Sequence, residues 1–300
     1  ETKVEMSPEG VAQYAKQMVD KGVRVIGGCC GTSPEFIEAV RKATSDANPL
    51  LINNERITAA SSSSKTVVLG RAFKIIGERI NPTGKEDMAK ALKEKDFYYI
   101  VDEAIEQREA GADILDVNVC ISDIDEKETM VQAIREIQSM VNIPLQIDST
   151  DPEVIEAAVR IYNGKPIINS VSGTKASMEA IFPIAKKYGT CLIALTLDEK
   201  GIPASAEERF EIAANIVDEA EKWGISRENI IIDCLVLTAS NNQREAMETL
   251  KAIELVKKEL KTPTILGISN VSYGLPNRSL LNRTYLAMAL AMGLDAAILN

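Results

Sequence analysis

The sequence predicts an α/β protein whose main body is a (β/α)8 TIM barrel. From residue 74 onward, eight short apolar runs alternate with segments that have the apolar periodicity of a helix. Continuous apolar strands between helices are typical of a parallel sheet that helices cover on both faces. A doubly wound open sheet shares this alternation and remains the alternative fold.

The eight expected strands share an apolar body and a polar carboxyl end. In order they are KIIGERIN (74–81), DILDVN (113–118), PLQIDST (144–150), PIINSVSG (166–173), CLIALT (191–196), IIIDCL (230–235), TILGISNVS (264–272) and DAAILN (295–300). Apolar residues at helical spacing predict intervening helices, which include 96–110, 152–162, 206–223 and 242–260. The eighth run lies at the end of the sequence, so we expect the last helix of the barrel to be missing.

The first 46 residues read as helix, strand, turn and helix. Ser7-Pro8 predicts the start of a helix, and Gly22 predicts its end. Residues 23–26, apolar except for Arg24, predict a short buried strand, and Ser33-Pro34 predicts the start of a second helix. One such unit is too small to bury its own faces, so we expect it to belong to a larger body.

Residues 47–73 contain many Asn, Ser and Thr residues and show little periodicity, which predicts an interdomain linker. The expected parts are therefore 1–46, 47–73 and 74–300. The sequence lacks an initial Met and a signal peptide, so we expect it to be a piece of a longer protein.

Composition excludes several classes of function. The formal net charge of −10 argues against a general nucleic-acid binder, which needs clustered Lys and Arg. No apolar run approaches the roughly 20 residues that span a membrane. The five cysteines have no repeated spacing, which fits the reducing cytoplasm. The chain contains no histidine, so acid and base chemistry must come from other groups.

The stretch VIGGCCGT, residues 25–32, places Cys29 and Cys30 side by side between glycines. Adjacent cysteines rarely reach the geometry of a disulfide without strain. Two interpretations remain open from these residues alone. The pair is either a set of small residues in a tight turn or part of a thiolate metal site.

The carboxyl ends of the expected strands carry acids and amides. In a barrel these ends meet at one mouth, where active sites lie. The residues are Glu78, Asn81, Asp116, Asn118, Asp148, Asn169, Asp233 and Asn270, followed by Ile298 to Asn300. Each acid alone is explained as a helix cap, but the whole set predicts a site. Carboxylates and carboxamides suit a neutral heterocycle that has both hydrogen-bond donors and acceptors.

Segment 75–300 resembles the pterin-binding family, which includes dihydropteroate synthase and the methyltetrahydrofolate methyltransferases. The motifs that carry the resemblance are GERINPTGK (77–85), LDVN (115–118), QIDST (146–150), INSVSG (168–173), IIDCL (231–235) and LGISNVSYGLP (266–276). The resemblance implies that Asp148, Asn169 and Asp233 hold the pterin ring. It also implies that Asn270 acts catalytically beside N5 of 5-methyltetrahydrofolate. Further expected substrate contacts are Glu78, Asn81, Asp116, Asn118, Arg278 and Ile298.

The fragment GGCCGTSPEFI, residues 27–37, is similar to the end of the homocysteine-binding barrel of homocysteine methyltransferases. This resemblance implies that 1–46 is the terminal β/α unit of a second (β/α)8 barrel. It also implies that Cys29 and Cys30 bind zinc, with a third protein ligand outside this chain.

A homocysteine module followed by a pterin module implies a cobalamin-dependent methyltransferase. Methyl would pass from 5-methyltetrahydrofolate to cob(I)alamin, and then to zinc-bound homocysteine. The cobalamin would be carried by a separate domain of the same protein, with no nucleic-acid or membrane partner. Dihydropteroate synthase and a non-catalytic folate-binding module are the alternatives; the former needs cations for a pyrophosphate, which Lys85 and Arg278 would begin to supply.

Overall fold

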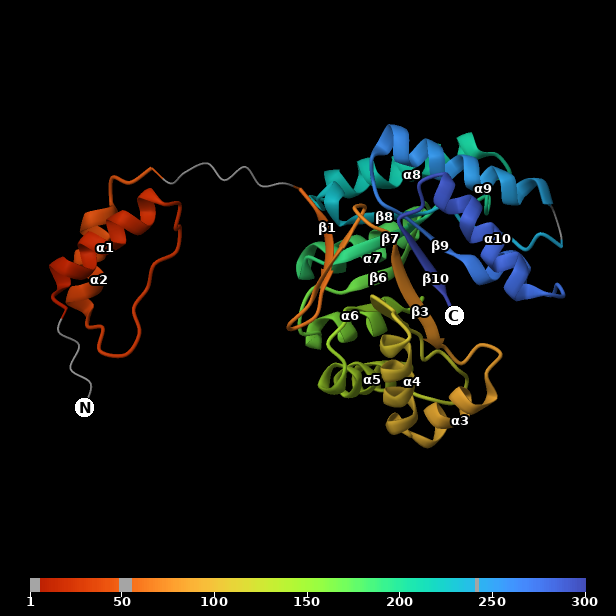
Figure 1. Cartoon of the computed structure of the whole chain (residues 1–300), viewed down its shortest axis with the longest axis horizontal. Helices are drawn as coiled ribbons and strands as arrows, with labels where there is room; N and C mark the ends of the chain where they lie inside the picture. Colours follow the sequence, from red (N-terminus) through yellow and green to blue (C-terminus); the bar gives the residue numbers. More distant parts are fainter. Residues whose placement is uncertain (1–5, 49–55, 241–242) are drawn as a thin grey trace. The chain divides into compact units, whose positions relative to one another are not determined.

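The structure is a computed structural model that describes residues 6–48, 56–240 and 243–300. The chain forms two compact units, Glu1–Arg56 and Ile57–Asn300, which are drawn in Figure 1. Among the described residues, the helices are all too short or too polar to traverse a lipid bilayer.

The second unit contains a closed barrel of eight parallel strands, as the sequence predicts. The strands are β3 Lys74–Ile80, β4 Ile114–Val117, β5 Leu145–Asp148, β6 Ile167–Ser172, β7 Cys191–Leu195, β8 Ile230–Asp233, β9 Thr264–Gly267 and β10 Ala296–Leu299. The barrel closes where β10 pairs with β3, with Ala296 opposite Lys74. Closure makes the open-sheet alternative wrong.

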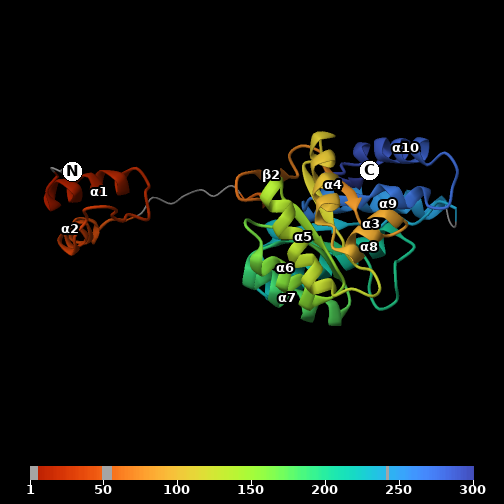
Figure 2. The same ribbon diagram turned by 90° about the horizontal axis from the view of Figure 1, so that it is seen from below.

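Helices surround the strands on the outside of the barrel. They are α3 Glu86–Glu94, α4 Phe97–Glu109, α5 Glu126–Met140, α6 Pro152–Ile161, α7 Lys175–Tyr188, α8 Ala206–Lys222, α9 Gln243–Leu255 and α10 Arg278–Ala291. Helices α5, α6 and α7 lie side by side in Figure 2. A π-helical turn, Val256–Leu260, continues α9, so the expected helix 242–260 is present over its described residues.

Many of these helices begin at a side-chain cap, which explains why they start where they do. Asp125, Asp151, Thr174 and Ser205 each accept a hydrogen bond from a backbone N–H of the first turn. Because the same kind of residue ends the strands and caps the helices, the sequence alone could not separate the two roles.

A two-stranded hairpin precedes the barrel and packs against it. Strands β1 Thr58–Ser61 and β2 Thr66–Leu69 pair with each other. Ala60, Val67 and Leu69 share one buried cluster with side chains inside the barrel, such as Ile76 and Cys191. The expected linker 47–73 therefore contains ordered structure that belongs to the barrel unit, whose boundary falls between Arg56 and Ile57.

The first unit consists of two packed helices, α1 Pro8–Asp20 and α2 Pro34–Thr44. Ser7 caps α1 as expected, since its Oγ accepts a hydrogen bond from the N–H of Gly10 at 3.2 Å. The predicted buried strand 23–26 is wrong: these residues have no regular structure, and Val25 is 89% exposed. A strand needs a neighbouring backbone to pair with, and the described residues of this unit provide none.

Candidate functional site

The alternation of side chains along the strands carries polar groups into the barrel at its carboxyl end. In five strands, a residue of the buried interior cluster stands two positions before a predicted site residue. The pairs are Ile76 and Glu78, Ile114 and Asp116, Ile167 and Asn169, Ile231 and Asp233, and Ala296 and Ile298. Side chains two residues apart share one face of a strand, so these site residues face the barrel interior.

Asp116 on β4 lies at the centre of the polar network of the mouth and is 3% exposed. Its Oδ1 accepts hydrogen bonds from Gln146 Nε2 at 2.5 Å and from Asn169 Nδ2 at 3.5 Å. Burial raises the pKa of Asp116 well above its usual range, and the charge of Asp148 raises it further. The two amide hydrogen bonds oppose this rise.

Asp148 at the end of β5 is the second acid of this network. Its Oδ2 accepts a hydrogen bond from Asn118 Nδ2 at 3.0 Å, while Asn118 Oδ1 accepts one from the N–H of Cys120 at 2.9 Å. Burial raises the pKa of Asp148, the Asn118 hydrogen bond opposes the rise, and Glu126 adds to it. Two interacting acids with raised pKa values favour a state in which the pair holds a proton.

Asp233 at the end of β8 is a separate buried acid, 8% exposed. Its Oδ1 accepts a hydrogen bond from the N–H of Leu235 at 2.7 Å. Burial raises the pKa of Asp233 to about 7, although this hydrogen bond and the positive charge of Arg209 both lower it. Asp233 therefore changes its charge close to neutral pH.

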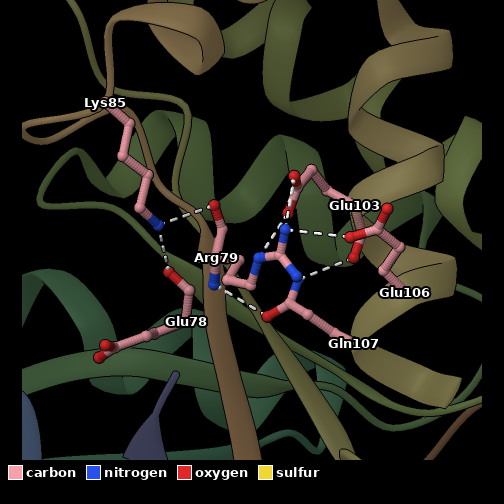
Figure 3. A network of polar contacts seen from close by, with 6 residues as sticks. All are labelled: Glu78, Arg79, Lys85, Glu103, Glu106 and Gln107. Atoms are coloured by element: carbon pink, nitrogen blue, oxygen red, sulfur yellow. Dashed lines mark hydrogen bonds and ion pairs between the residues drawn. The ribbon is translucent and has the colours of Figure 1, made fainter. Parts of the chain in front are cut away.

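Glu78 on β3 joins the mouth to the segment that follows β9. Its Oε1 accepts a hydrogen bond from Ser269 Oγ at 2.6 Å. Lys85 lies beside it and donates to the backbone carbonyls of Glu78 at 3.2 Å and Arg79 at 3.0 Å (Figure 3). Burial lowers the pKa of Lys85, and the charge of Glu78 opposes this change.

The backbone at Glu78 is irregular, and α4 holds it in place. The register of β3 against β4 shifts between Gly77 and Ile80. There the N–H of Arg79 donates to Gln107 Oε1 at 2.8 Å, and its guanidinium pairs with Glu103 and Glu106 (Figure 3). A Cβ atom at Gly77 would collide with Gln107 Oε1, so glycine leaves the room that this buried side chain needs.

The other predicted residues lie at the same end of the barrel with looser partners. Asn81 Oδ1 accepts the N–H of Thr83 at 2.9 Å and so supports a local turn. Asn270 is exposed in the 3-10 helix Ile268–Ser272, directly after β9. The exposed Arg278 donates from Nη2 to the Ser269 carbonyl at 3.0 Å.

The structure thus brings some predicted residues into direct contact and leaves others apart. Hydrogen bonds join Asp116 to Asn169 and Asn118 to Asp148. Among the hydrogen bonds of the described residues, none links Asp233 or Asn270 to another member of the predicted set. Ile298 is half-buried on β10 and offers only apolar contact.

Two polar residues of the mouth were not predicted. Gln146 is fully buried in β5, and Ser269 binds Glu78. The signal for Gln146 was available, because it is a lone amide inside the apolar run PLQID. Ser269 gave no comparable signal, since serine is common in loops.

Cys29 and Cys30 lie in the first unit, in a turn held by Thr32. The Cys29 N–H donates to Thr32 Oγ1 at 3.1 Å, and a Cβ at Gly28 would collide with the Thr32 side chain. The two exposed thiols have sulfurs 3.8 Å apart. Two sulfurs bound to one tetrahedral zinc are about 3.8 Å apart, so the pair fits two of its positions. The described residues contain no group of three His, Cys, Asp or Glu side chains that would complete such a site.

Comparisons with known proteins place the barrel in a known family. The family model described as "Pterin binding enzyme" matches residues 77–300, and the model described as "Homocysteine S-methyltransferase" matches residues 1–44. The chain belongs to the pterin-binding enzyme family. Both resemblances that the motifs indicate are confirmed.

Within that family, the curated relatives show which kinds of enzyme the chain is similar to. The chain is 29% identical to the methionine synthase of Mycobacterium leprae (strain TN) and 30% identical to that of Mycobacterium tuberculosis (strain ATCC 25618 / H37Rv). Each alignment covers 98% of this chain but 26% of the relative, so the chain spans about a quarter of their length. It is 33% identical to the methylcorrinoid:tetrahydrofolate methyltransferase of Eubacterium limosum, over 75% of this chain and 84% of the relative.

Solved structures share the barrel. Dihydropteroate synthase from Xanthomonas albilineans, in complex with indole-2-carboxylic acid and 6-chloroguanine, superposes with a TM-score of 0.60 at 17% identity. Dihydropteroate synthase from Thermus thermophilus gives 0.60 at 16%. In each case 80% of this chain and 92% of the other are covered. At this identity the likeness shows the fold alone.

Proposed function

We propose that this chain binds 5-methyltetrahydrofolate at the barrel mouth and presents its methyl group to a corrinoid carried by another domain. The names of the three curated relatives support this class of reaction. The observation that carries the proposal is the acid and amide network on β4, β5 and β6, at the end of the barrel where such folds bind ligands.

The network has the chemistry that a pterin ring requires. A pterin is a neutral heterocycle with N–H donors and ring acceptors, which carboxylates and carboxamides recognise through paired hydrogen bonds. Asp148, Asn169 and Asp233 hold the ring; in support, Asn169 and Asp233 face the barrel interior, and Asp148 joins the polar network of the mouth through Asn118. Glu78, Asp116 and Asn118 line the same mouth and support them.

We place the Asn270 side chain beside N5 of the folate. The methyl group leaves a tertiary amine whose anion is a poor leaving group, so transfer needs protonation or strong hydrogen bonding at N5. The Asn270 amide donates such a hydrogen bond but cannot supply a proton. The candidates to hold that proton are the buried acids of the mouth, Asp116, Asp148 and Asp233, since burial raises the pKa of each.

We assign the first unit to the second step of the reaction, in which the methyl group passes from the corrinoid to homocysteine. We assign Cys29 and Cys30 to a zinc site that takes a third ligand from outside this chain, as their sulfur separation allows. Zinc would keep the homocysteine thiol deprotonated near neutral pH. The whole reaction is then that of 5-methyltetrahydrofolate–homocysteine methyltransferase, a cytoplasmic methionine synthase.

Single turnovers test the proposal directly. The chain is mixed in a stopped-flow instrument with saturating 5-methyltetrahydrofolate and cob(I)alamin, and methylcobalamin formation is followed by absorbance. Transfer well above the uncatalysed rate supports the proposal. Folate binding without transfer would instead indicate a non-catalytic module, and condensation of a pterin pyrophosphate with an aromatic amine would indicate dihydropteroate synthase.

Asn270→Ala is expected to slow transfer more than it weakens binding. A hydrogen bond that strengthens as the C–N bond breaks stabilises the transition state differentially. Losing one such donor costs on the order of a hundredfold in rate, about 3 kcal/mol. Asn142→Ala, at an exposed position just before β5, is the matched control. A rate for Asn270→Ala within about twofold of wild type would remove Asn270 from catalysis.

A further inference from the structure

The loop that follows β8 is held by one buried arginine. Arg209 on α8 has no exposed surface. Its Nη1 donates to the carbonyls of Cys234 at 2.9 Å and Leu235 at 2.7 Å, and to Thr249 Oγ1 at 2.6 Å. Its Nε donates to the Pro203 carbonyl at 2.8 Å. A single side chain therefore joins α8 and α9 to the loop that precedes α8 and to the loop between β8 and α9.

The loop has a conformation that needs this support. Leu235 has a φ of 53°, in the left-handed region that side chains other than glycine rarely adopt. Its N–H donates to Asp233 Oδ1, and its carbonyl accepts from Arg209 and from Thr249 Oγ1. Such a conformation persists only where the surroundings hold it in place, and it is concentrated at functional sites.

We propose that Arg209 is a positioning residue for Asp233, because it fixes the turn that the Asp233 carboxylate caps and places a positive charge within electrostatic reach of it. The inference rests on the proposed folate site, in which Asp233 binds the pterin. Arg209 itself is buried behind the loop and acts on the substrate through Asp233.

The charge of Arg209 gives this role a measurable signature. Burial raises the pKa of Asp233, and Arg209 opposes that rise. Burial also lowers the pKa of Arg209, but a guanidinium remains charged in proteins. The other ionisable groups that act on Arg209 are Cys234 after β8, Glu245 and Glu248 on α9, and Tyr285 on α10. Removing the guanidinium therefore leaves Asp233 with less stabilisation of its ionised form.

Three variants of the full 300-residue chain separate positioning from packing. Arg209→Met removes the charge and the hydrogen bonds but keeps a long side chain. Arg209→Lys keeps the charge and loses the planar guanidinium that reaches three backbone carbonyls. Thr249→Val removes a hydroxyl that contacts both Arg209 and Leu235, but changes no charge.

The readouts are the Asp233 titration and folate affinity. Carboxyl ¹³C NMR, with the signal assigned by its loss in Asp233→Asn, follows the titration without any ligand. Isothermal calorimetry follows 5-methyltetrahydrofolate affinity across pH 6 to 8.5. We expect Arg209→Met to raise the Asp233 titration midpoint and to weaken folate binding about tenfold near pH 7.5. Arg209→Lys should keep the midpoint near wild type and still weaken binding, and Thr249→Val should leave the midpoint unchanged.

Failure of this inference can be distinguished from failure of the proposed function. Equal midpoints in wild type, Arg209→Met and Arg209→Lys would overturn the inference, whether or not folate binds. A shifted midpoint with no folate binding by the wild type would overturn the proposed function and the assigned role of Asp233. If Arg209→Met does not fold, Arg209→Lys decides the question, because wild-type folate affinity in that variant would contradict the positioning role.

Discussion

Asp233 shows how a buried acid costs stability. Its pKa is raised by burial from an ordinary value of 3.8 to about 7, so the folded chain holds the proton more tightly than the unfolded chain does. Stability associated with this group is therefore fully present below pH 4 and is lost as the pH rises through 7. A folded protein tolerates such a group where function requires it.

Asp233→Asn is expected to make the folded chain more stable at pH 8. The asparagine keeps an acceptor for the Leu235 N–H and never ionises. A rise in pKa from 3.8 to about 7 corresponds to at most about 4 kcal/mol, and this gain should shrink steadily between pH 7 and pH 4. Urea unfolding across this pH range measures it, with the exposed Asp123→Asn as control. A gain in unfolding free energy that does not depend on pH would show that Asp233 does not titrate within this pH range.

The pair of cysteines, Cys29 and Cys30, leads to a prediction about zinc content. Two thiols supply too few ligands for a stable protein zinc site, which has three or four. Zinc should therefore bind weakly to this chain and stoichiometrically to a longer chain that includes the segment before it. Elemental analysis after dialysis measures both. In the longer chain, full zinc content after Cys29→Ser and Cys30→Ser would contradict the assignment.

At the scale of single residues, sequence reasoning finds acids at strand ends and misses polar groups inside helices. Asp116 and Asp148 were predictable because each interrupts an apolar run. Arg209 was harder to recognise, since a charged residue on a helix usually faces solvent. Its spacing from Ala213, Ile216 and Val217 nevertheless places it on the buried face of α8.

At the scale of elements, the irregular end of β3 depends on a side chain from α4. Gln107→Met keeps the volume but leaves the N–H of Arg79 without its acceptor, which costs about 1–3 kcal/mol. The variant should also bind folate more weakly, because the same backbone presents Glu78. Thermal unfolding and folate titration measure the two effects.

Gln132→Met on α5 is the control for this change, because the Gln132 amide donates to the side chain of Glu136 one turn away on the same helix. Unchanged stability and affinity in Gln107→Met would show that the bulge holds its shape without α4.

The apolar pattern alone decides which strands are predictable, because it does not show whether a pairing partner is present. All eight barrel strands are predictable because each contains a short apolar run between segments with helical periodicity. Residues 23–26 are apolar except for Arg24 but form no strand, because apolar composition does not supply a pairing partner. The segment of β1 and β2 has the composition of a linker, since Ser61 to Ser64 obscure the short apolar segments on either side.

At the scale of the whole molecule, the division at Arg56 predicts independent folding of the barrel unit. Residues 57–300 contain the hairpin, the closed barrel and every predicted pterin contact. We expect this segment to unfold cooperatively and to bind folate with the affinity of the full chain, as calorimetry would measure. A segment that begins at residue 74 lacks the hairpin and should be less stable, since it exposes the apolar residues that Ala60, Val67 and Leu69 cover.

The pairing of β10 with β3 has a consequence for the synthesis of the chain. Lys74 emerges from the ribosome long before its partner Ala296. At about 5–20 residues per second, roughly 10 to 45 s separate the two strands. During that interval β3 has an unpaired edge, and an edge of this kind recruits other nascent chains. Chaperone capacity during translation, rather than the stability of the finished barrel, should therefore limit the soluble yield.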